Sequence, residues 1–287
     1  MRILVLGAGG MAGHVIALKL MEKGHDVTGL ARRELSYCRH IVADVRDEVN
    51  LKRILLENNY DIVINAIGVL HPVNFKPAYG IWINSYFPHM LVELLEGTET
   101  RIIHLSTDCV FGGHEGGGYT EKSLPTATDY YGRSKLLGEF DDDKNLVFRM
   151  SIVGPDINEN GEGLFHWFMR QKEAVNGYAQ VIWTGVSTVV LAEAINAALA
   201  QNLSGLYQLV NNENISKYDL LRLFNKLRMD PIAIARTDDY VVNKSLVNTR
   251  KDFDFSVPSY EEMVDGIGEW IHTHKKLYPW YQMKGEA

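Results

Sequence analysis

Tyr131 and Lys135 stand four residues apart in the segment YYGRSK, and this spacing places both side chains on one face of a helix. An ammonium group beside a phenol favours the phenolate, which lowers the pKa of the phenol toward the range where it exchanges protons near neutral pH. Such a phenol is a suitable acid for a ketone. Many Tyr and Lys residues share this spacing on exposed helices, but here an apolar run, RIIHLS, leads into Thr107 upstream of the pair. The candidate catalytic residues are therefore Thr107, Tyr131 and Lys135.

A glycine-rich segment, VLGAGGMAGHV, follows the first apolar run of the chain and leads into a helical pattern. Glycines let a backbone turn tightly and approach a pyrophosphate, whose charge is met by the helix N-terminus. Gly7, Gly9 and Ala12 fit one dinucleotide-binding spacing, while Gly7, Gly10 and Gly13 fit another. The residues expected at the cofactor are Gly7, Gly10, Met11 and Gly13.

The end of the second apolar run indicates which dinucleotide is bound. In sites that prefer NAD, an acidic residue about 20 positions after the glycines holds the ribose 2′-hydroxyl. Here the run DVTGLA is followed by Arg32 and Arg33, and a guanidinium favours a 2′-phosphate. We expect NADPH as the cofactor, with NADH as the alternative, Arg32 as the contact and Arg33 as a solvated side chain. Asp44, with Val45 beside it, ends the third run, where a carboxylate could accept from the adenine amino group.

The elements that must position these residues alternate along the chain. Short β-branched runs begin at residues 2, 25, 40, 60, 101 and 145, and helical patterns separate them. This rhythm predicts βαβ units, and the nearly continuous apolar strands predict a parallel sheet covered on both faces. We expect an α/β protein with a doubly wound Rossmann domain over residues 1–153, rejoined by residues 186–212. The remainder of 154–287 is expected to form a smaller C-terminal lobe that binds substrate.

Composition narrows the classes of partner. The 287 residues carry a formal charge of −7 with 46% hydrophobic residues, and neither nucleic acid nor an anionic membrane is expected without clustered basic charge. No apolar run reaches the ~18 to 20 residues that a membrane helix needs. The two cysteines and the absence of a secretory leader pattern predict a cytoplasmic location. The histidines show no paired metal-ligand spacing, so no catalytic metal is expected.

Taken together, these motifs resemble the extended short-chain dehydrogenases/reductases. Within them, HLSTDCVFGG and YYGRSKLLGE are similar to the dTDP-4-dehydrorhamnose reductase subfamily. The resemblance covers essentially the whole chain and is strongest over residues 1–155, where GAGGMAG, NAIG and RMSIVG also match. It thins in the C-terminal third.

The resemblance implies a role for each matching residue. Tyr131 would protonate the carbonyl oxygen as hydride arrives, and Thr107 would donate to the same oxygen. Lys135 would lower the pKa of Tyr131 and bind the nicotinamide ribose. Tyr130 lacks a lysine four residues on and receives no role. The remaining residues implied for the cofactor cleft are Asn65, Ala66, Gly68 and Asn84.

The residues after Thr107 bear on the type of reaction. Related sugar-nucleotide dehydratases place an Asp-Glu pair there, because elimination of water needs a further acid and base. This chain has Asp108 followed by Cys109, which favours reduction of a keto group, with C4 the expected position, on a nucleotide-linked deoxysugar for cell-surface polysaccharide precursors. An epimerase of the same fold and a non-catalytic NADP-binding regulatory subunit are the alternatives.

The sugar nucleotide should lie between the strand ends and the C-terminal lobe. Trp183 could stack on a base or sugar, or pack in a core. Lys244 and Arg250 could bind a diphosphate, or belong to a solvated basic loop. The oligomeric state stays open, with a homodimer as one alternative. The candidate substrate-binding residues are Asp108, Arg149, Ser151, Trp183, Lys244 and Arg250.

Overall fold

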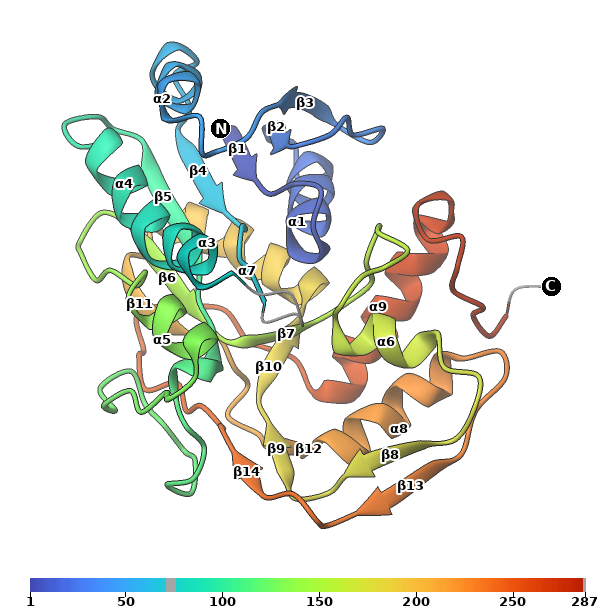
Figure 1. The fold of residues 1–287 in the computed structure, drawn as a ribbon. Helices are drawn as coiled ribbons and strands as arrows, with labels where there is room; N and C mark the ends of the chain where they lie inside the picture. The colour runs from blue at the N-terminus through green and yellow to red at the C-terminus, as the bar shows by residue number, and fades with distance from the viewer. Residues whose placement is uncertain (71–75, 286–287) are drawn as a thin grey trace.

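A seven-stranded sheet forms the centre of the protein (Figure 1). The computed structural model describes residues 1–70 and 76–285. Every pairing in this sheet is parallel, and its order is β11-β6-β5-β4-β1-β2-β3. The strands are β1 (Arg2–Leu6), β2 (Asp26–Ala31), β3 (Arg39–Val42), β4 (Ile62–Asn65), β5 (Arg101–Leu105), β6 (Leu146–Arg149) and β11 (Gly205–Gln208). The predicted Rossmann fold is confirmed.

Strand order reverses beside β1, and this reversal fixes where a ligand can bind. The chain runs outward from β1 to β2 and β3, then returns to β4 on the other side of β1. In open parallel sheets the crevice at such a switch point, outside the carboxyl ends of the strands, is the usual ligand site. Figure 1 shows the arrowheads of β1 and β4 pointing toward the smaller lobe. The glycine turn that follows β1 therefore faces that lobe.

Two separate apolar cores cover the two faces of the sheet. Ile3 and Val5 pack in one core with α1 (Met11–Glu22) and α7 (Thr188–Gln201), while Leu4 and Leu6 pack in the other. Successive side chains of a strand point to opposite faces, so one apolar strand supplies both cores. The second core also receives α2 (Glu48–Glu57) and a helical stretch made of α3 (Pro77–Ile81), a π-helical turn over Trp82–Tyr86 and α4 (Phe87–Leu94).

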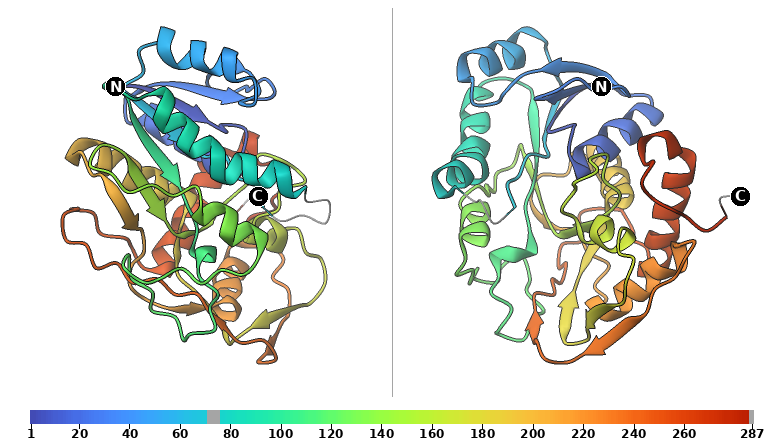
Figure 2. Two further views of the ribbon diagram at one scale, coloured as in Figure 1. Left: turned by 60° about the vertical axis from the view of Figure 1, so that its left-hand side comes forward. Right: turned by 45° about the vertical axis from the view of Figure 1, so that its right-hand side comes forward.

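The smaller lobe is built after β6. Its two-stranded sheet pairs β7 (Ser151–Val153) with β10 (Gly185–Ser187), and further short strands join distant segments. Both views in Figure 2 show this lobe at one side of the main sheet. The short strands are β8 (Val175–Tyr178), β9 (Val181–Trp183), β12 (Ile215–Ser216), β13 (Ile234–Thr237) and β14 (Val242–Asn243). The helices are α5 (Tyr130–Leu136) at the main sheet, and α6 (Leu164–Met169), α8 (Lys217–Leu227) and α9 (Tyr260–Thr273) in the lobe.

The C-terminal segment after α9 is anchored to the helix that carries the glycine turn. His14 of α1 is fully buried, with Nδ1 2.8 Å from the Gly10 carbonyl oxygen and Nε2 2.6 Å from the Tyr278 hydroxyl. Because the Gly10 carbonyl oxygen only accepts, Nδ1 of a neutral ring donates to it, and the Tyr278 hydroxyl donates to Nε2 while it accepts from Trp270 Nε1 at 2.7 Å. Burial lowers the pKa of His14 to about 4, so the ring stays neutral. The end of the chain thereby stabilises the start of α1.

Within the described ranges, 1–70 and 76–285, no helix has the length and apolar character needed to cross a membrane.

Candidate active site

The glycine turn distinguishes between the two spacings that the sequence allows. Gly7 has φ +82°, a conformation that side chains rarely adopt. A Cβ on Gly13 would lie 2.2 Å from the Gly7 carbonyl oxygen, whereas a Cβ on Gly9 would have its nearest neighbour at 3.5 Å. Gly10 is the N-cap of α1. The turn thus depends on Gly7 and Gly13, whereas a Cβ on Gly10 would make an ordinary contact at 3.4 Å, and the turn leaves backbone N–H groups at the N-terminus of α1 for an anion.

The two arginines after β2 lie in different surroundings. Arg32 is exposed, and its charge helps to lower the pKa of Asp44. Arg33 instead donates to Asn158 Oδ1, while Asn158 Nδ2 donates to the Gly9 carbonyl oxygen at 3.0 Å. Arg33 is exposed, as expected of a solvated side chain, but it also contacts Asn158, and Asn158 joins the loop after β7 to the glycine turn. Sequence patterns gave no signal for Asn158, which lies far along the chain.

Asp44 and Val45 follow β3, as the sequence predicts. Val45 is buried, and Asp44 forms a bidentate ion pair with Arg46, whose Nη2 lies 2.5 Å from Asp44 Oδ2. Hydrogen bonding from Arg46 lowers the pKa of Asp44 to about 2. The carboxylate is therefore ionised at neutral pH, and an adenine amino group would share it with Arg46.

Residues at the end of β4 form the wall of the cleft. Asn65 is fully buried and its Oδ1 accepts from the Ile67 N–H at 3.1 Å. Asn84, also buried, accepts from the Val69 N–H at 2.9 Å and donates to the Ser134 hydroxyl at 3.0 Å. These hydrogen bonds occupy the side-chain amide of Asn84. The residue therefore holds the loop after β4 against α5, and its amide is not free to bind a cofactor. Ala66 and Gly68 flank this loop, and a Cβ on Gly68 would meet only Asn84 Oδ1, at 4.0 Å.

The three predicted catalytic residues meet at the carboxyl end of β5. Thr107 is buried, and the turn that follows it packs against the start of α5: a Cβ on Gly132, the neighbour of Tyr131, would lie 2.1 Å from the Cys109 carbonyl oxygen. The Asp129 side chain caps α5 by accepting from the Gly132 N–H at 2.8 Å. Lys135, one turn further, donates to the Leu105 carbonyl oxygen at 2.6 Å. The structure thus brings a hydroxyl, a phenol and an ammonium together.

The pKa of Tyr131 moves in the direction opposite to that predicted. Burial raises it, the charges of Asp108 and Asp129 add to the rise, and hydrogen bonding with Thr107 opposes it. The ammonium of Lys135 does not counter this rise because it is turned toward the Leu105 carbonyl oxygen. Burial also lowers the pKa of Lys135 to about 8, against the charge of Glu139. In this arrangement the phenol holds its proton, as an acid must.

Asp108 forms the centre of the predicted substrate side. Its Oδ1 accepts from the Ser151 hydroxyl at 2.9 Å and from Thr107 Oγ1 at 3.2 Å. Burial raises the pKa of Asp108, and the charges of Lys244 and Lys217 oppose the rise. Lys244 was expected here; Lys217, at the start of α8, was missed because only the fold brings that helix to Asp108.

Cys109 follows Asp108 and lies beside Tyr131. Burial, followed by the charge of Asp108, raises the pKa of this thiol to about 12. The thiol is therefore neutral and is a poor base at physiological pH.

Arg149 and Trp183 are each held by other partners. The Arg149 side chain is 3% exposed and forms a buried ion pair with Glu139, at 2.9 Å for Nε to Oε1 and 2.5 Å for Nη2 to Oε2. Trp183 is buried in the first core, with its ring 5.7 Å from that of Tyr260. The predicted substrate contacts of both residues are corrected: Arg149 balances a buried carboxylate, and Trp183 packs.

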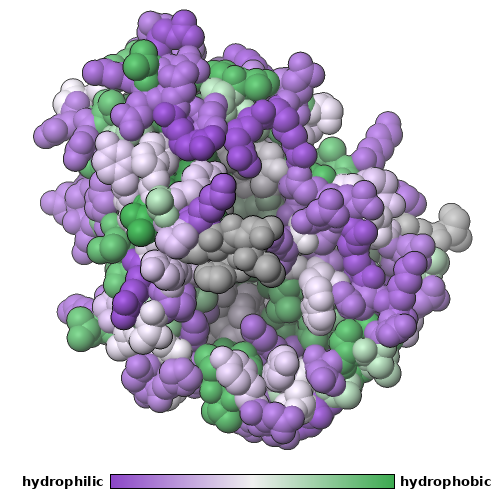
Figure 3. Space-filling view, viewed as in Figure 1, coloured by the Kyte–Doolittle hydropathy of each residue, from purple (hydrophilic) through white to green (hydrophobic). Residues whose placement is uncertain are grey.

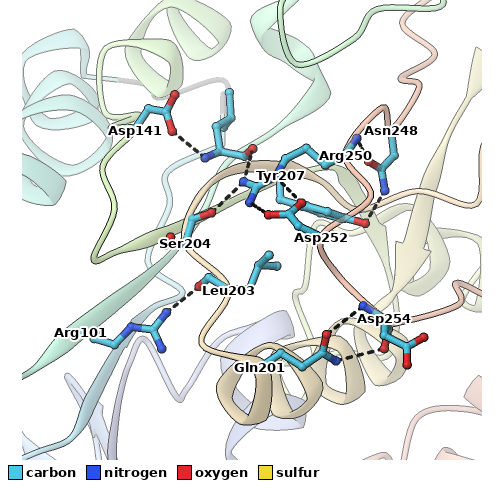
Figure 4. Close-up of polar contacts among 11 residues, drawn as sticks. Arg101, Asp141, Gln201, Leu203, Ser204, Tyr207, Asn248, Arg250, Asp252 and Asp254 are labelled. Carbon is cyan, nitrogen blue, oxygen red and sulfur yellow. Dashed lines mark hydrogen bonds and ion pairs between the residues drawn. The ribbon is translucent and has the colours of Figure 1, made fainter.

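Arg250 lies beside the start of β11, among the polar contacts drawn in Figure 4. Its Nη1 donates to the carbonyl oxygens of Ser204, at 2.7 Å, and Leu206, at 3.0 Å, beside the first residue of β11. Asp252 pairs with the same guanidinium, which lies 5.5 Å from the centre of the Tyr207 ring. Because β11 runs parallel to β6, its start is remote from Asp108. Arg250 is therefore a structural residue and not a diphosphate ligand of this site.

Figure 3 shows the surface hollowed between the Rossmann domain and the smaller lobe, with hydrophilic residues along much of the rim. Among the residues that the structure describes, no group of three or more His, Cys, Asp or Glu side chains is arranged to hold a metal ion.

The parallel sheet, the glycine turn and the Thr, Tyr and Lys group define a Rossmann-fold protein of the short-chain dehydrogenase/reductase type. Residues 1–245 match the family described as RmlD substrate binding domain, and the chain belongs to that family.

Two individual relatives agree with this assignment, and one solved structure shares the fold. A probable low-salt glycan biosynthesis reductase of Haloferax volcanii is 34% identical over 161 residues, which cover 53% of this chain and 54% of the relative. A dTDP-4-dehydrorhamnose reductase of Mycolicibacterium smegmatis is 34% identical over 147 residues, covering 48% and 40%. The matches thus span about half the length of these relatives or less. The structure of a Bacillus anthracis dTDP-4-dehydrorhamnose reductase in complex with NADP has a TM-score of 0.80 at 18% identity, covering 95% and 99% of the two chains.

Proposed function

We propose that this protein catalyses the NADPH-dependent reduction of a keto group, expected at C4, on a nucleotide-linked deoxysugar of cell-surface polysaccharide synthesis. The observation that carries the proposal is the close packing of the start of α5, which holds Tyr131, against the turn after Thr107 at the carboxyl end of β5, with Lys135 one turn along α5. The family membership and the names of the relatives support the same reaction.

The residues of the cleft fit a dinucleotide. The turn at Gly7 and Gly13 has no space for a Cβ, and backbone N–H groups at the start of α1 suit a pyrophosphate. Exposed Arg32 suits a 2′-phosphate, and ionised Asp44 suits an adenine amino group. Bound NADPH would supply the hydride.

The chain supplies the proton and the orientation of the substrate. Tyr131 gives its hydroxyl proton to the carbonyl oxygen as the alcohol forms, and the Thr107 hydroxyl orients the same oxygen. Lys135, with a pKa of about 8, is mostly charged at pH 7 and stabilises the phenolate that remains. Lys244 and Lys217 place positive charge near Asp108, where they would attract the diphosphate of the substrate.

The neutral thiol of Cys109 favours reduction over dehydration. Elimination of water needs a base in addition to the phenol, and a thiol with a pKa raised to about 12 is not ionised. An epimerase, which regenerates its cofactor within each cycle, would require no net consumption of NADPH.

The test is NADPH consumption with a dTDP-linked 4-keto-6-deoxysugar. We expect turnover in the unmodified protein, loss of about 10² to 10⁴-fold in Tyr131→Phe, and little change in Tyr130→Phe, which alters the exposed neighbouring phenol. Equal turnover in Tyr131→Phe would contradict the assignment of the acid. A cytoplasmic location and a homodimer stay predictions.

A further inference from the structure

A buried polar pair lies directly behind Lys135. His104 of β5 and Asn65 of β4 are neighbours across the parallel sheet and both are fully buried. Asn65 Nδ2 lies 3.1 Å from His104 Nδ1, and Lys135 Nζ lies 3.3 Å from His104 Nε2. The imidazole therefore connects the end of β4 with the lysine of the candidate active site.

The hydrogen-bond partners of Asn65 select one tautomer of the imidazole. Asn65 Oδ1 accepts from the Ile67 N–H, which leaves its amino group facing His104 Nδ1. An amino group only donates, so Nδ1 must accept. A neutral imidazole has one N–H, and that hydrogen is then on Nε2, facing Lys135.

The state of His104 is fixed by its surroundings. Burial, followed by the charges of Lys135 and His89, lowers the pKa of His104 well below its usual value, so the ring is neutral. An Nε2–H group directed at Lys135 is unfavourable beside a charged ammonium, because the ammonium can only donate hydrogen bonds. A neutral amine has a lone pair that can accept from this N–H group.

We propose that His104, held by Asn65 as the Nε2–H tautomer, is a positioning residue that favours the neutral amine of Lys135 and directs its Nζ between the imidazole and the Leu105 carbonyl oxygen. His104 does not touch the substrate in this account. It acts through Lys135, so the inference extends the proposed function to a residue outside the Thr, Tyr and Lys group.

Other titratable groups around this pair are accounted for. Glu139, which follows α5, raises the pKa of Lys135, but it is also paired with Arg149 of β6. His89 of α4 acts on His104, and Tyr131 lies one turn before Lys135 on α5. Burial is the largest cause of the lowered pKa of Lys135, and the tautomer adds to it.

The direct test is nuclear magnetic resonance of the cofactor-free protein, which needs no substrate. The ¹⁵N shifts of the His104 ring report which nitrogen carries the hydrogen, and we expect Nε2. The ¹³Cε shift of Lys135, assigned with Lys135→Arg, reports its pKa. If Nδ1 carries the hydrogen at neutral pH, the proposal is overturned without any variant at His104.

Two substitutions test the direction of the effect. His104→Phe removes the opposing N–H, and Asn65→Leu releases the tautomer so that Nε2 can accept from the ammonium. Both should raise the pKa of Lys135 by roughly one unit, a tenfold change in its proton affinity. His40→Phe, on distant β3, is the matched control and should leave it unchanged. An unchanged or lowered pKa of Lys135 in His104→Phe would refute the inference.

The same change should appear in catalysis. Loss of the Lys135 ammonium should reduce kcat/KM above about pH 8, given its pKa, and in His104→Phe this alkaline decrease should move to higher pH. If the shifts in resonance appear but the unmodified protein consumes no NADPH, the proposed function fails and the role of His104 stands. If turnover occurs without the resonance shifts, the proposed function stands and the role of His104 fails.

Discussion

Replacing Gly13 by alanine tests how closely the glycine turn and α1 must approach. The new Cβ would lie 2.2 Å from the Gly7 carbonyl oxygen, where ordinary contact begins at 3.4 Å. The start of α1 would have to move by about 1.2 Å, the difference between these two distances. Because α1 is buried against α7 in the first core, that movement would disturb packing as well as the turn.

The magnitude follows from two opposing effects. Alanine is favoured over glycine within a helix by about 1 kcal/mol, but forcing an extra methyl group into a packed site costs about 1 to 3 kcal/mol, and more where backbone must move. Backbone is the obstacle here, so we expect a net loss of about 1 to 2 kcal/mol in unfolding free energy. The same distortion displaces the N–H groups meant for the pyrophosphate, so the dissociation constant for NADPH should rise at least about tenfold.

Gly9→Ala is the matched control in the same turn. Its Cβ would make only ordinary contacts, at 3.5 Å from Ala31 Cβ and 3.7 Å from Leu35 Cδ2. Fluorescence titration with NADPH and urea unfolding should leave this variant close to the unmodified protein. Normal NADPH affinity in Gly13→Ala, or an equal loss in Gly9→Ala, would refute the requirement for glycine at position 13.

Three further predictions concern burial and charge. Glu139→Ala leaves a buried guanidinium without its partner and should lower the unfolding free energy by about 3 to 5 kcal/mol. Glu261→Ala, which removes an exposed pair, should lower it by less than about 1 kcal/mol. Equal losses of unfolding free energy in urea denaturation of the two variants would refute this difference. The pKa of His14 is about 4 in the folded protein and 6.5 in the unfolded chain, so between these values the unfolded chain binds one more proton than the folded protein. The unfolding free energy should therefore fall by about 3 kcal/mol as the pH decreases from 6.5 to 4. A His14→Gln variant whose unfolding free energy changes equally with pH would contradict this. Lys244→Met should raise KM for the sugar nucleotide about 10- to 100-fold, while Arg250→Met should leave KM unchanged, and the reverse result would exchange their roles.

The sequence predicted the elements that depend on local pattern. The alternating runs gave the parallel sheet, because an apolar strand must be covered on both faces, as Ile3 and Leu4 now are by different cores. The glycine spacing left two alternatives, and only the distance between Gly13 and the Gly7 carbonyl oxygen separates them.

The polar residues of the C-terminal third were harder to predict, since their roles depend on which segments meet. Arg250 and Lys244 lie six residues apart, yet one contacts the start of β11 and the other lies near Asp108. Both are basic residues of one polar segment, so the sequence alone does not distinguish their roles. Arg149 was expected in the cleft from its strand-end position, but Glu139, which follows α5, pairs with it.

The central claim is that Tyr131 provides the proton while NADPH is consumed by a keto sugar nucleotide. It is tested most directly with NADPH deuterated at the transferable position and a dTDP-linked 4-keto-6-deoxysugar, followed by mass spectrometry of the product. We predict one deuterium on the new alcohol carbon for each NADP⁺ formed, and no labelled product from Tyr131→Phe on the same timescale. Unlabelled product formed without loss of NADPH, or the same labelled product from Tyr131→Phe, would contradict the account.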